Sequence, residues 1–231
     1  MILKLLWPEI CPFCGKVSRT GICLACEKKI NNLIIEQPCC MKCGKPVWKA
    51  EQEYCLDCLK TYHYFESGRA LWLHKPPVNY SIYQFKYHNQ RQFGKYYAKI
   101  MAKRFKKTIE SWKPDMIIPI PLHRRKQRKR GYNQAEIIAR ELGKLLKISV
   151  NDNILRRVRY TEPQKKMTQK LRKHNLKNAF KAEGDLRKIK SVLLIDDIYT
   201  TGNTIDEAAK ILMDAGVEKV FFLTVSIGQG Y

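Results

Sequence analysis

Long apolar runs are absent from this sequence of 231 residues. A membrane-spanning helix needs roughly 18 or more consecutive apolar residues. The apolar opening segment, residues 1–7 (MILKLLW), is interrupted by Lys4 and is followed by Pro8 and Glu9. It is also too short for the apolar core of a signal peptide. We therefore expect no transmembrane segment and a cytoplasmic location.

Acidic residues are scarce, because 21 Asp and Glu stand against 44 Lys and Arg, which gives a formal net charge of +23. A hydrophobic content of 45% excludes a disordered chain. The positive charge is concentrated in residues 61–155 (+14) and 156–190 (+10), whereas residues 191–231 carry −4. Such a region attracts polyanions, either nucleic acid or phosphorylated metabolites. A membrane surface is less favoured, because the sequence shows no basic amphipathic helix with a bulky apolar face.

Disulfides are disfavoured in a reducing compartment, so the nine cysteines need another role. Two C-x-x-C pairs supply four thiolates for one tetrahedral Zn²⁺, and four pairs predict two structural zinc sites. A thioredoxin-type redox centre would need one such pair at a helix start and not four in series. The eight expected ligands are Cys11, Cys14, Cys23, Cys26, Cys40, Cys43, Cys55 and Cys58.

The pairing of these cysteines has two solutions. Short loops favour sequential pairing, the first C-x-x-C with the second and the third with the fourth, over an interleaved arrangement. Gly15 and Gly44 each follow a pair and allow the positive φ that turns backbone amides toward thiolates. Cys39 could replace Cys40 as a ligand, but the repeated C-x-x-C-G pattern favours Cys40.

The chain divides into three parts by composition: a double zinc-ribbon-like region (1–60), a connecting region (61–114) and an α/β domain (115–231). The connecting region is rich in aromatics and lysines and is expected to pack on the α/β domain. Its helical pattern runs through Phe93, Tyr97, Ile100, Met101 and Phe105. The mixed aromatics and cations of residues 83–91 could stack nucleic-acid bases, although core packing is favoured for any single ring.

The α/β domain alternates apolar strands with helices. We expect strands at residues 115–121, 191–195 and 219–225, and helices at 131–147 and 203–215. Continuously apolar strands separated by helices predict a parallel sheet with both faces covered. Ligands of such sheets bind at the carboxyl ends of the strands.

Residues 192–204 (VLLIDDIYTTGNT) carry the most specific chemistry. Asp196 and Asp197 at the end of an apolar strand can accept hydrogen bonds from a vicinal diol, directly or through Mg²⁺-bound water. The small polar residues that follow, at the start of a helix, form an anion-binding nest for a phosphate. A diol beside a phosphate describes a ribose 5-phosphate. The alternative is an ordinary turn and helix cap.

This segment resembles the phosphoribosyl pyrophosphate (PRPP) signature of type I phosphoribosyltransferases. Further segments resemble the ComF family of competence proteins: 119–124 (PIPLHR), 130–135 (RGYNQA), 159–164 (RYTEPQ), 172–175 (RKHN) and 179–180 (AF). The resemblance spans nearly the whole chain. It implies a phosphoribosyltransferase-like fold behind zinc ribbons and a cytoplasmic factor in natural transformation that handles incoming single-stranded DNA. It also implies components of the DNA-uptake machinery as partners.

The resemblance also assigns site residues. The catalytic pair Asp196 and Asp197 would hold the ribose hydroxyls and Mg²⁺, and the loop around Leu122 would face pyrophosphate. Residues 156–177 would form a flap containing Thr161 and Gln164. Asn203 stands where many phosphoribosyltransferases have Gly or Ala, but it can still cap the helix. The PRPP-binding set is Asp196, Asp197, Thr200, Thr201, Gly202, Asn203, Thr204, His123 and Arg124.

The cationic run at residues 123–130 lies between a strand and a helix, and alone it would be interpreted as a solvated loop. Because it adjoins the expected ligand edge and a second cationic stretch, we favour a continuous anion surface. Two phosphate groups do not need so many cations, whereas a phosphodiester chain would use them. The expected DNA-binding residues are Arg124, Arg125, Lys126, Arg128, Lys129, Arg130, Lys165, Lys166, Lys170 and Arg172.

Two functions are therefore compared. The first is a single-stranded DNA-binding competence factor with a PRPP site. The second is an active transferase that moves the ribose 5-phosphate of PRPP to a nitrogen acceptor. The net charge favours the first, and the short segment after the last strand leaves little room for a base-binding hood.

Overall fold

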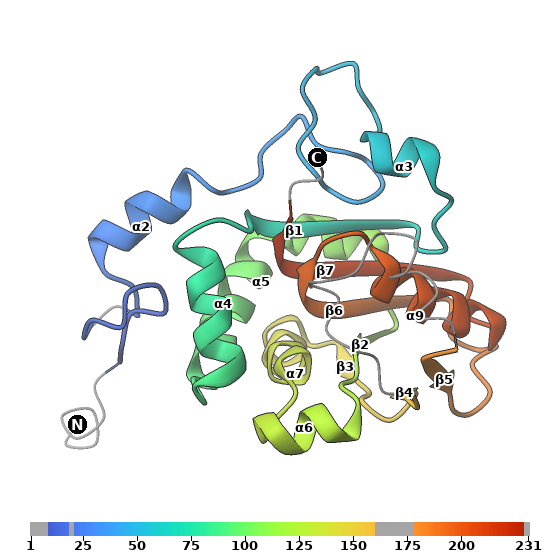
Figure 1. Ribbon diagram of the computed structural model, residues 1–231. Helices are drawn as coiled ribbons and strands as arrows, with labels where there is room; N and C mark the ends of the chain where they lie inside the picture. Colours follow the sequence, from blue (N-terminus) through green and yellow to red (C-terminus); the bar gives the residue numbers. More distant parts are fainter. Residues whose placement is uncertain (1–8, 19–20, 160–177, 229–231) are drawn as a thin grey trace.

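The computed structural model describes residues 9–18, 21–159 and 178–228 (Figure 1). Its centre is a parallel five-stranded sheet in the order β1-β7-β6-β2-β3, with all four pairings parallel. The strands are β1 (Ser67–Leu73), β2 (Met116–Pro119), β3 (Ser149–Val150), β6 (Ser191–Tyr199) and β7 (Lys219–Ile227). A separate antiparallel pair joins β4 (Leu155–Arg157) to β5 (Phe180–Ala182). The expected parallel α/β sheet is confirmed.

Alternating residues of the central strands supply two hydrophobic layers. Leu193 and Phe221 belong to the layer shared with α4 (Val78–Tyr87), α5 (Gln92–Trp112) and α7 (Gln134–Leu146). Leu194 and Phe222 belong to the opposite layer, which contains the buried face of α9 (Asn203–Asp214). Because successive strand residues point to opposite sides, a strand that is buried on both faces is apolar throughout.

The two N-terminal cysteine modules cover opposite layers of the sheet. The first, with α2 (Leu24–Asn31), contributes Phe13, whose ring contacts Trp72 of β1 and Tyr96 of α5 edge-on at 5.8 and 5.9 Å. The second, with α3 (Leu56–Lys60), joins the layer of α9 through its buried cysteines. Figure 1 shows the two modules on separate sides of the molecule.

Several elements differ from the sequence expectation. The cationic run expected to be a loop forms the helix α6 (Arg124–Arg130). The His123 side chain accepts a hydrogen bond from the Arg125 amide at its start, and Gly131 ends it with a φ of +78°. Strand β1 and helix α4 were not predicted. Strand β6 continues past the carboxylate pair to Tyr199.

The aromatic connecting region is divided between core and surface. Phe85, Phe93, Tyr97 and Phe105 are buried, as the core interpretation predicted. Tyr83 and other tyrosines of α4 are exposed. Among the described residues, no helix is both long and apolar enough to cross a membrane.

Candidate functional site

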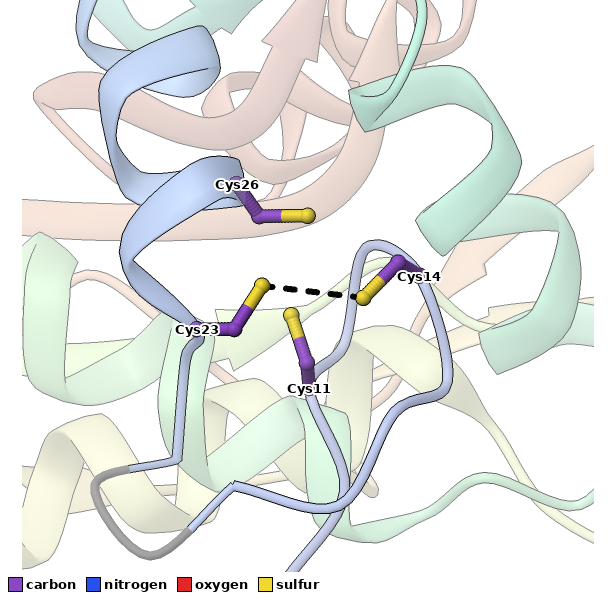
Figure 2. Close-up of side chains that lie close together, drawn as sticks. All are labelled: Cys11, Cys14, Cys23 and Cys26. Carbon is purple, nitrogen blue, oxygen red and sulfur yellow. Dashed lines mark hydrogen bonds between the residues drawn. The ribbon is translucent and has the colours of Figure 1, made fainter.

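Each cysteine module gathers four sulfurs around one point. Figure 2 shows the first set converging from a loop and from the start of α2. Within each set the Sγ atoms lie within 4.8 Å of one another, and the Cys14–Cys23 and Cys43–Cys55 sulfurs are 3.7 Å apart. A tetrahedral Zn²⁺ with bonds of about 2.3 Å places its sulfurs about 3.8 Å apart. The donor sets therefore fit structural Zn²⁺. They are Cys11, Cys14, Cys23 and Cys26, and Cys40, Cys43, Cys55 and Cys58.

The two modules repeat the same local construction. In the first, the Cys11 amide donates to the Lys16 carbonyl at 2.7 Å, and the Gly15 amide donates to the Cys11 carbonyl at 2.9 Å. The same bonds recur at Cys40 with the same lengths. Gly15 and Gly44 have φ values of +74° and +76°. Sequential pairing is confirmed, and Cys40, not Cys39, is the ligand.

The second module lies directly beside the end of β6. The Nζ of its buried Lys45 contacts Asp57 at 2.5 Å and lies 5.9 Å from the centre of the Tyr199 ring. Tyr199 in turn stacks on Phe222, with ring centres 4.9 Å apart. The residue that precedes the expected phosphate loop is thus held between the sheet and the zinc module.

The carboxylate pair lies near the carboxyl end of β6. Asp197 points to the layer that contains α4, where its Oδ1 forms an ion pair with the Lys86 ammonium at 2.8 Å. Both side chains are mostly buried, which strengthens their attraction relative to an exposed pair. Sequence reasoning did not assign Lys86 to the site, because 111 positions separate it from its partner.

Asp196 has the strongly perturbed carboxyl of this pair. Burial, and then the neighbouring charge of Asp197, raise the pKa of Asp196 to about 7, while Lys86 and Arg157 oppose the rise. The Asp197 amide also donates to Asp196 Oδ1 at 2.8 Å. A carboxyl that exchanges its proton near neutral pH is typical of functional sites.

Lys86 and Arg157 act on this carboxylate pair, and Lys126 lies near both of these cations. Lys86 comes from α4, Lys126 from α6 and Arg157 from β4. Burial, and then the charges of Arg157, Arg130 and Lys86, lower the pKa of Lys126 to about 8. Burial also lowers the pKa of Arg157, whose guanidinium lies 5.3 Å from the centre of the Phe180 ring. An anion bound here would relieve the repulsion among these cations.

The loop after β6 has the features of a phosphate-binding turn. Residues 200–204 line one small pocket together with Asp196. Gly202 has a φ of +80°, and a Cβ at this position would come within 2.5 Å of the Tyr199 hydroxyl oxygen, so the tight turn requires glycine.

The expectation that Asn203 caps α9 is wrong. Gly202 occupies the cap position, and Asn203 is the first helical residue. Among the described residues no side chain caps α9, and the buried Nδ2 of Asn203 has no hydrogen-bond partner. An unsatisfied buried donor and free helix amides beside a pocket both favour an oxygen-rich anion.

His123 and Arg124 lie at the start of α6. The His123 Nδ1 is used as the helix cap, and burial and then the surrounding cations lower the pKa of His123. Of the expected DNA-binding residues, the structure places Arg124, Arg125, Lys126, Arg128, Lys129 and Arg130 on this one helix.

Part of the expected site falls outside the described residues. This applies to the flap residues Thr161 and Gln164 and to the cations Lys165, Lys166, Lys170 and Arg172.

Comparison with known proteins assigns both parts of the chain. Residues 2–59 match the double zinc ribbon domain, and residues 84–227 match the phosphoribosyl transferase domain. Competence protein F of Haemophilus influenzae is 32% identical over 88% of this chain and 89% of that protein. DNA utilization protein YhgH of Salmonella typhimurium is 27% identical over 92% and 94%. Competence protein ComFC of Bacillus subtilis is 23% identical over 84% and 79%.

The match to Competence protein F covers most of both chains, and the match to the phosphoribosyl transferase domain covers most of the α/β region. The parallel sheet with flanking helices and the paired cysteine modules agree with these matches. The chain therefore belongs to the phosphoribosyl transferase family and, with its double zinc ribbon, to the ComF family of competence proteins.

Proposed function

We propose that this protein is a cytoplasmic competence factor that binds incoming single-stranded DNA and carries a PRPP site at the β6–α9 junction. The names of its relatives, Competence protein F and DNA utilization protein, support a role in the handling of DNA. The family match supports a phosphoribosyl ligand. Partners in the DNA-uptake machinery follow from the same family resemblance.

One observation carries the PRPP proposal. Asp196 and the uncapped start of α9 line one pocket, and the neighbouring carboxylate, Asp197, is paired with the Lys86 ammonium. In the proposed complex, Asp196 and Asp197 accept hydrogen bonds from the ribose hydroxyls. The amides and hydroxyls of residues 200–204 bind the 5-phosphate, and Asn203 Nδ2 gains an acceptor. His123 and Arg124 face the pyrophosphate.

Magnesium fits this site in combination with PRPP. Two carboxylates are oxygen ligands of the kind that Mg²⁺ prefers. Lys86, however, already neutralises Asp197 at 2.8 Å, and a cation bound to the protein alone would have to displace it. Mg²⁺ that arrives together with PRPP would supply charge neutralisation without that displacement, and Asp196 would be the carboxylate left to hold it. We therefore expect Mg²⁺ alone to change the melting temperature little, and Mg²⁺ with PRPP to raise it.

The PRPP site is tested by calorimetric titration of PRPP in the presence of Mg²⁺. At pH 8, where Asp196 is mostly ionised, a variant with Asp196→Asn and Asp197→Asn should lose at least tenfold in affinity, because the hydrogen bonds from the diol go to charged acceptors. Asp214→Asn, at the exposed far end of α9, is the matched control and should bind as the parent does. A double variant with parental affinity would refute the site assignment.

The DNA proposal depends on α6, which carries six cations in seven residues. Its test is fluorescence anisotropy of a labelled oligothymidylate at several salt concentrations. For single strands the slope of log affinity against log salt is about −0.7 for each phosphate contact. Arg128→Gln with Lys129→Gln should make the slope about 1.4 shallower, whereas Lys106→Gln with Lys107→Gln on α5 should leave it unchanged. Equal slopes in both variants would refute a DNA contact at α6.

An active transferase is the second candidate, and the pKa of about 7 for Asp196 favours it. A carboxyl that exchanges its proton at neutral pH beside a phosphate loop could take the proton of a nitrogen nucleophile. Release of pyrophosphate from PRPP with a panel of nitrogen acceptors tests this function. Acceptor-dependent release that Asp196→Asn abolishes would establish it, and the absence of release would leave a binding site only.

A further inference from the structure

Helix α4 has a buried face and an exposed aromatic face. Val78, Ile82 and Phe85 are buried in the layer beneath the sheet. Tyr80, Tyr83 and Tyr87 are 51%, 48% and 53% exposed. Their spacing of three and four residues places these tyrosines in one row along the helix. The sequence interpretation of this region as core is therefore wrong for this face.

The row continues directly into the cationic helix α6. The rings of Tyr83 and Tyr87 lie 5.0 Å apart, and the His88 ring lies 5.4 Å from Tyr83. The Arg130 guanidinium lies 4.9 Å from the centre of the Tyr87 ring, and its Nη2 donates to the Tyr87 hydroxyl at 3.2 Å. Figure 1 shows α4 running toward the end of the molecule where α6 lies.

The chain segments that form α4 and α6 contain no acidic residues. Residues 67–109 and 116–135, which include both helices, contain no Asp or Glu. Lys86 of the same helix reaches the candidate PRPP site through its ion pair with Asp197. The helix that carries the exposed rings thus contacts both α6, through Tyr87 and Arg130, and the candidate phosphoribosyl site, through Lys86.

We propose that Tyr83 and Tyr87 are a base-stacking platform for single-stranded DNA whose phosphates are bound by α6. This inference rests on the proposed DNA function and names the residues on which the bases stack. Aromatic faces next to a cationic track are the combination that binds unpaired bases without sequence preference. A duplex hides its base faces, so the platform favours single strands. Neither α4 nor α6 contains an acidic residue, which disfavours a basic partner. An acidic peptide would bind the cations of α6 without using the stacked rings.

The experiment compares two labelled probes of equal length, oligothymidylate and an abasic oligonucleotide that keeps the phosphates. The full-length, zinc-loaded protein should bind oligothymidylate more tightly. In the variant with Tyr83→Leu and Tyr87→Leu, each lost ring should weaken the binding of oligothymidylate by about fivefold or more. The same variant should bind the abasic probe as the parent does. Tyr83→Phe with Tyr87→Phe keeps the aromatic faces and should retain most of the affinity.

A matched control is available on another surface. Tyr62 and Tyr64 are also an exposed ring pair, 5.3 Å apart, and Lys210 lies 5.8 Å from the Tyr64 ring centre. Tyr62→Leu with Tyr64→Leu should leave both affinities unchanged. Circular dichroism melting of each variant confirms that its fold is intact.

The outcomes distinguish the DNA-binding function from the base-stacking platform. Binding of neither probe by the parent protein overturns the DNA function and the platform together. Equal binding of both probes by the parent, or an unchanged preference in the leucine variant, overturns the platform alone and leaves a purely electrostatic DNA site. Equal competition by duplex DNA or by polyglutamate also overturns it.

Discussion

Replacement of Asp196 by Asn tests the electrostatics of the candidate site through stability. The pKa of Asp196 is raised from 3.8 to about 7, mainly by burial. The folded protein therefore holds a proton that the unfolded chain releases above pH 4. A group of this kind contributes stability that is complete below the unfolded pKa and is lost as the pH rises through the folded pKa.

The size of the effect follows from the two pKa values. At pH 6 the held proton contributes ~1.4 kcal/mol to the free energy of unfolding, and at pH 8 it contributes ~0.1 kcal/mol. The uncharged Asn side chain shows no such change. The parent should therefore lose ~1.3 kcal/mol relative to Asp196→Asn between pH 6 and pH 8.

Urea denaturation at pH 6.0, 7.0 and 8.0 measures the difference. This range avoids acid conditions in which thiolate ligands protonate and release zinc. Asp214→Asn is the control, and its stability difference from the parent should not vary with pH. A gap between the parent and Asp196→Asn that stays constant across the three pH values would refute the raised pKa and the burial argument behind it.

Three further changes test other parts of the structure. Lys86→Met leaves its carboxylate partner unpaired and should lower the free energy of unfolding by about 1–3 kcal/mol in urea denaturation; parental stability would show that the ion pair is dispensable. Cys39→Ser should retain two zinc ions per chain and Cys40→Ser only one by atomic absorption, and the reverse result would assign the ligand to Cys39. Gly68→Ala places a methyl group inside the space of the Phe222 ring and should cost about 1–3 kcal/mol, so an unchanged melting temperature would contradict this packing.

The zinc sites could be predicted almost completely from the sequence because their information is local. Each knuckle has two cysteines three positions apart, and the first knuckle of each module is followed by a glycine with positive φ, Gly15 or Gly44. Strands β6 and β7 could also be predicted from the sequence, because a strand that is buried on both faces is largely apolar along its length. The pairing of the knuckles needed the structure, since either arrangement uses the same cysteines.

Helix α6 was not predicted because its run of like charges is typical of a solvated loop, although its residues favour a helix. Arg, Lys and Gln are strong helix formers, and His123 and Gly131 supply the two ends. Six like charges on one short helix repel one another. Periodicity offered no signal, because none of its residues is buried.

Contacts between distant segments set the rest of the site. Strand β1 contains Gly68 and Arg69, which weaken its strand signal, and it is fixed by its register against β7. The Lys86–Asp197 ion pair depends on the crossing of α4 over the end of β6. No local pattern around Lys86 distinguishes it from the other lysines of this basic region.

The placement of the two zinc modules has a consequence for the order of events during synthesis. Their ligands all lie within residues 11–58, so both modules can close around metal as soon as this segment leaves the ribosome. The surfaces on which they rest include β7, and β1 pairs with that same last strand. The earliest part of the chain thus holds its shape by metal ligation, while its docking surface is completed only with the final strand. A module without its zinc would leave that apolar surface uncovered even after the final strand had paired.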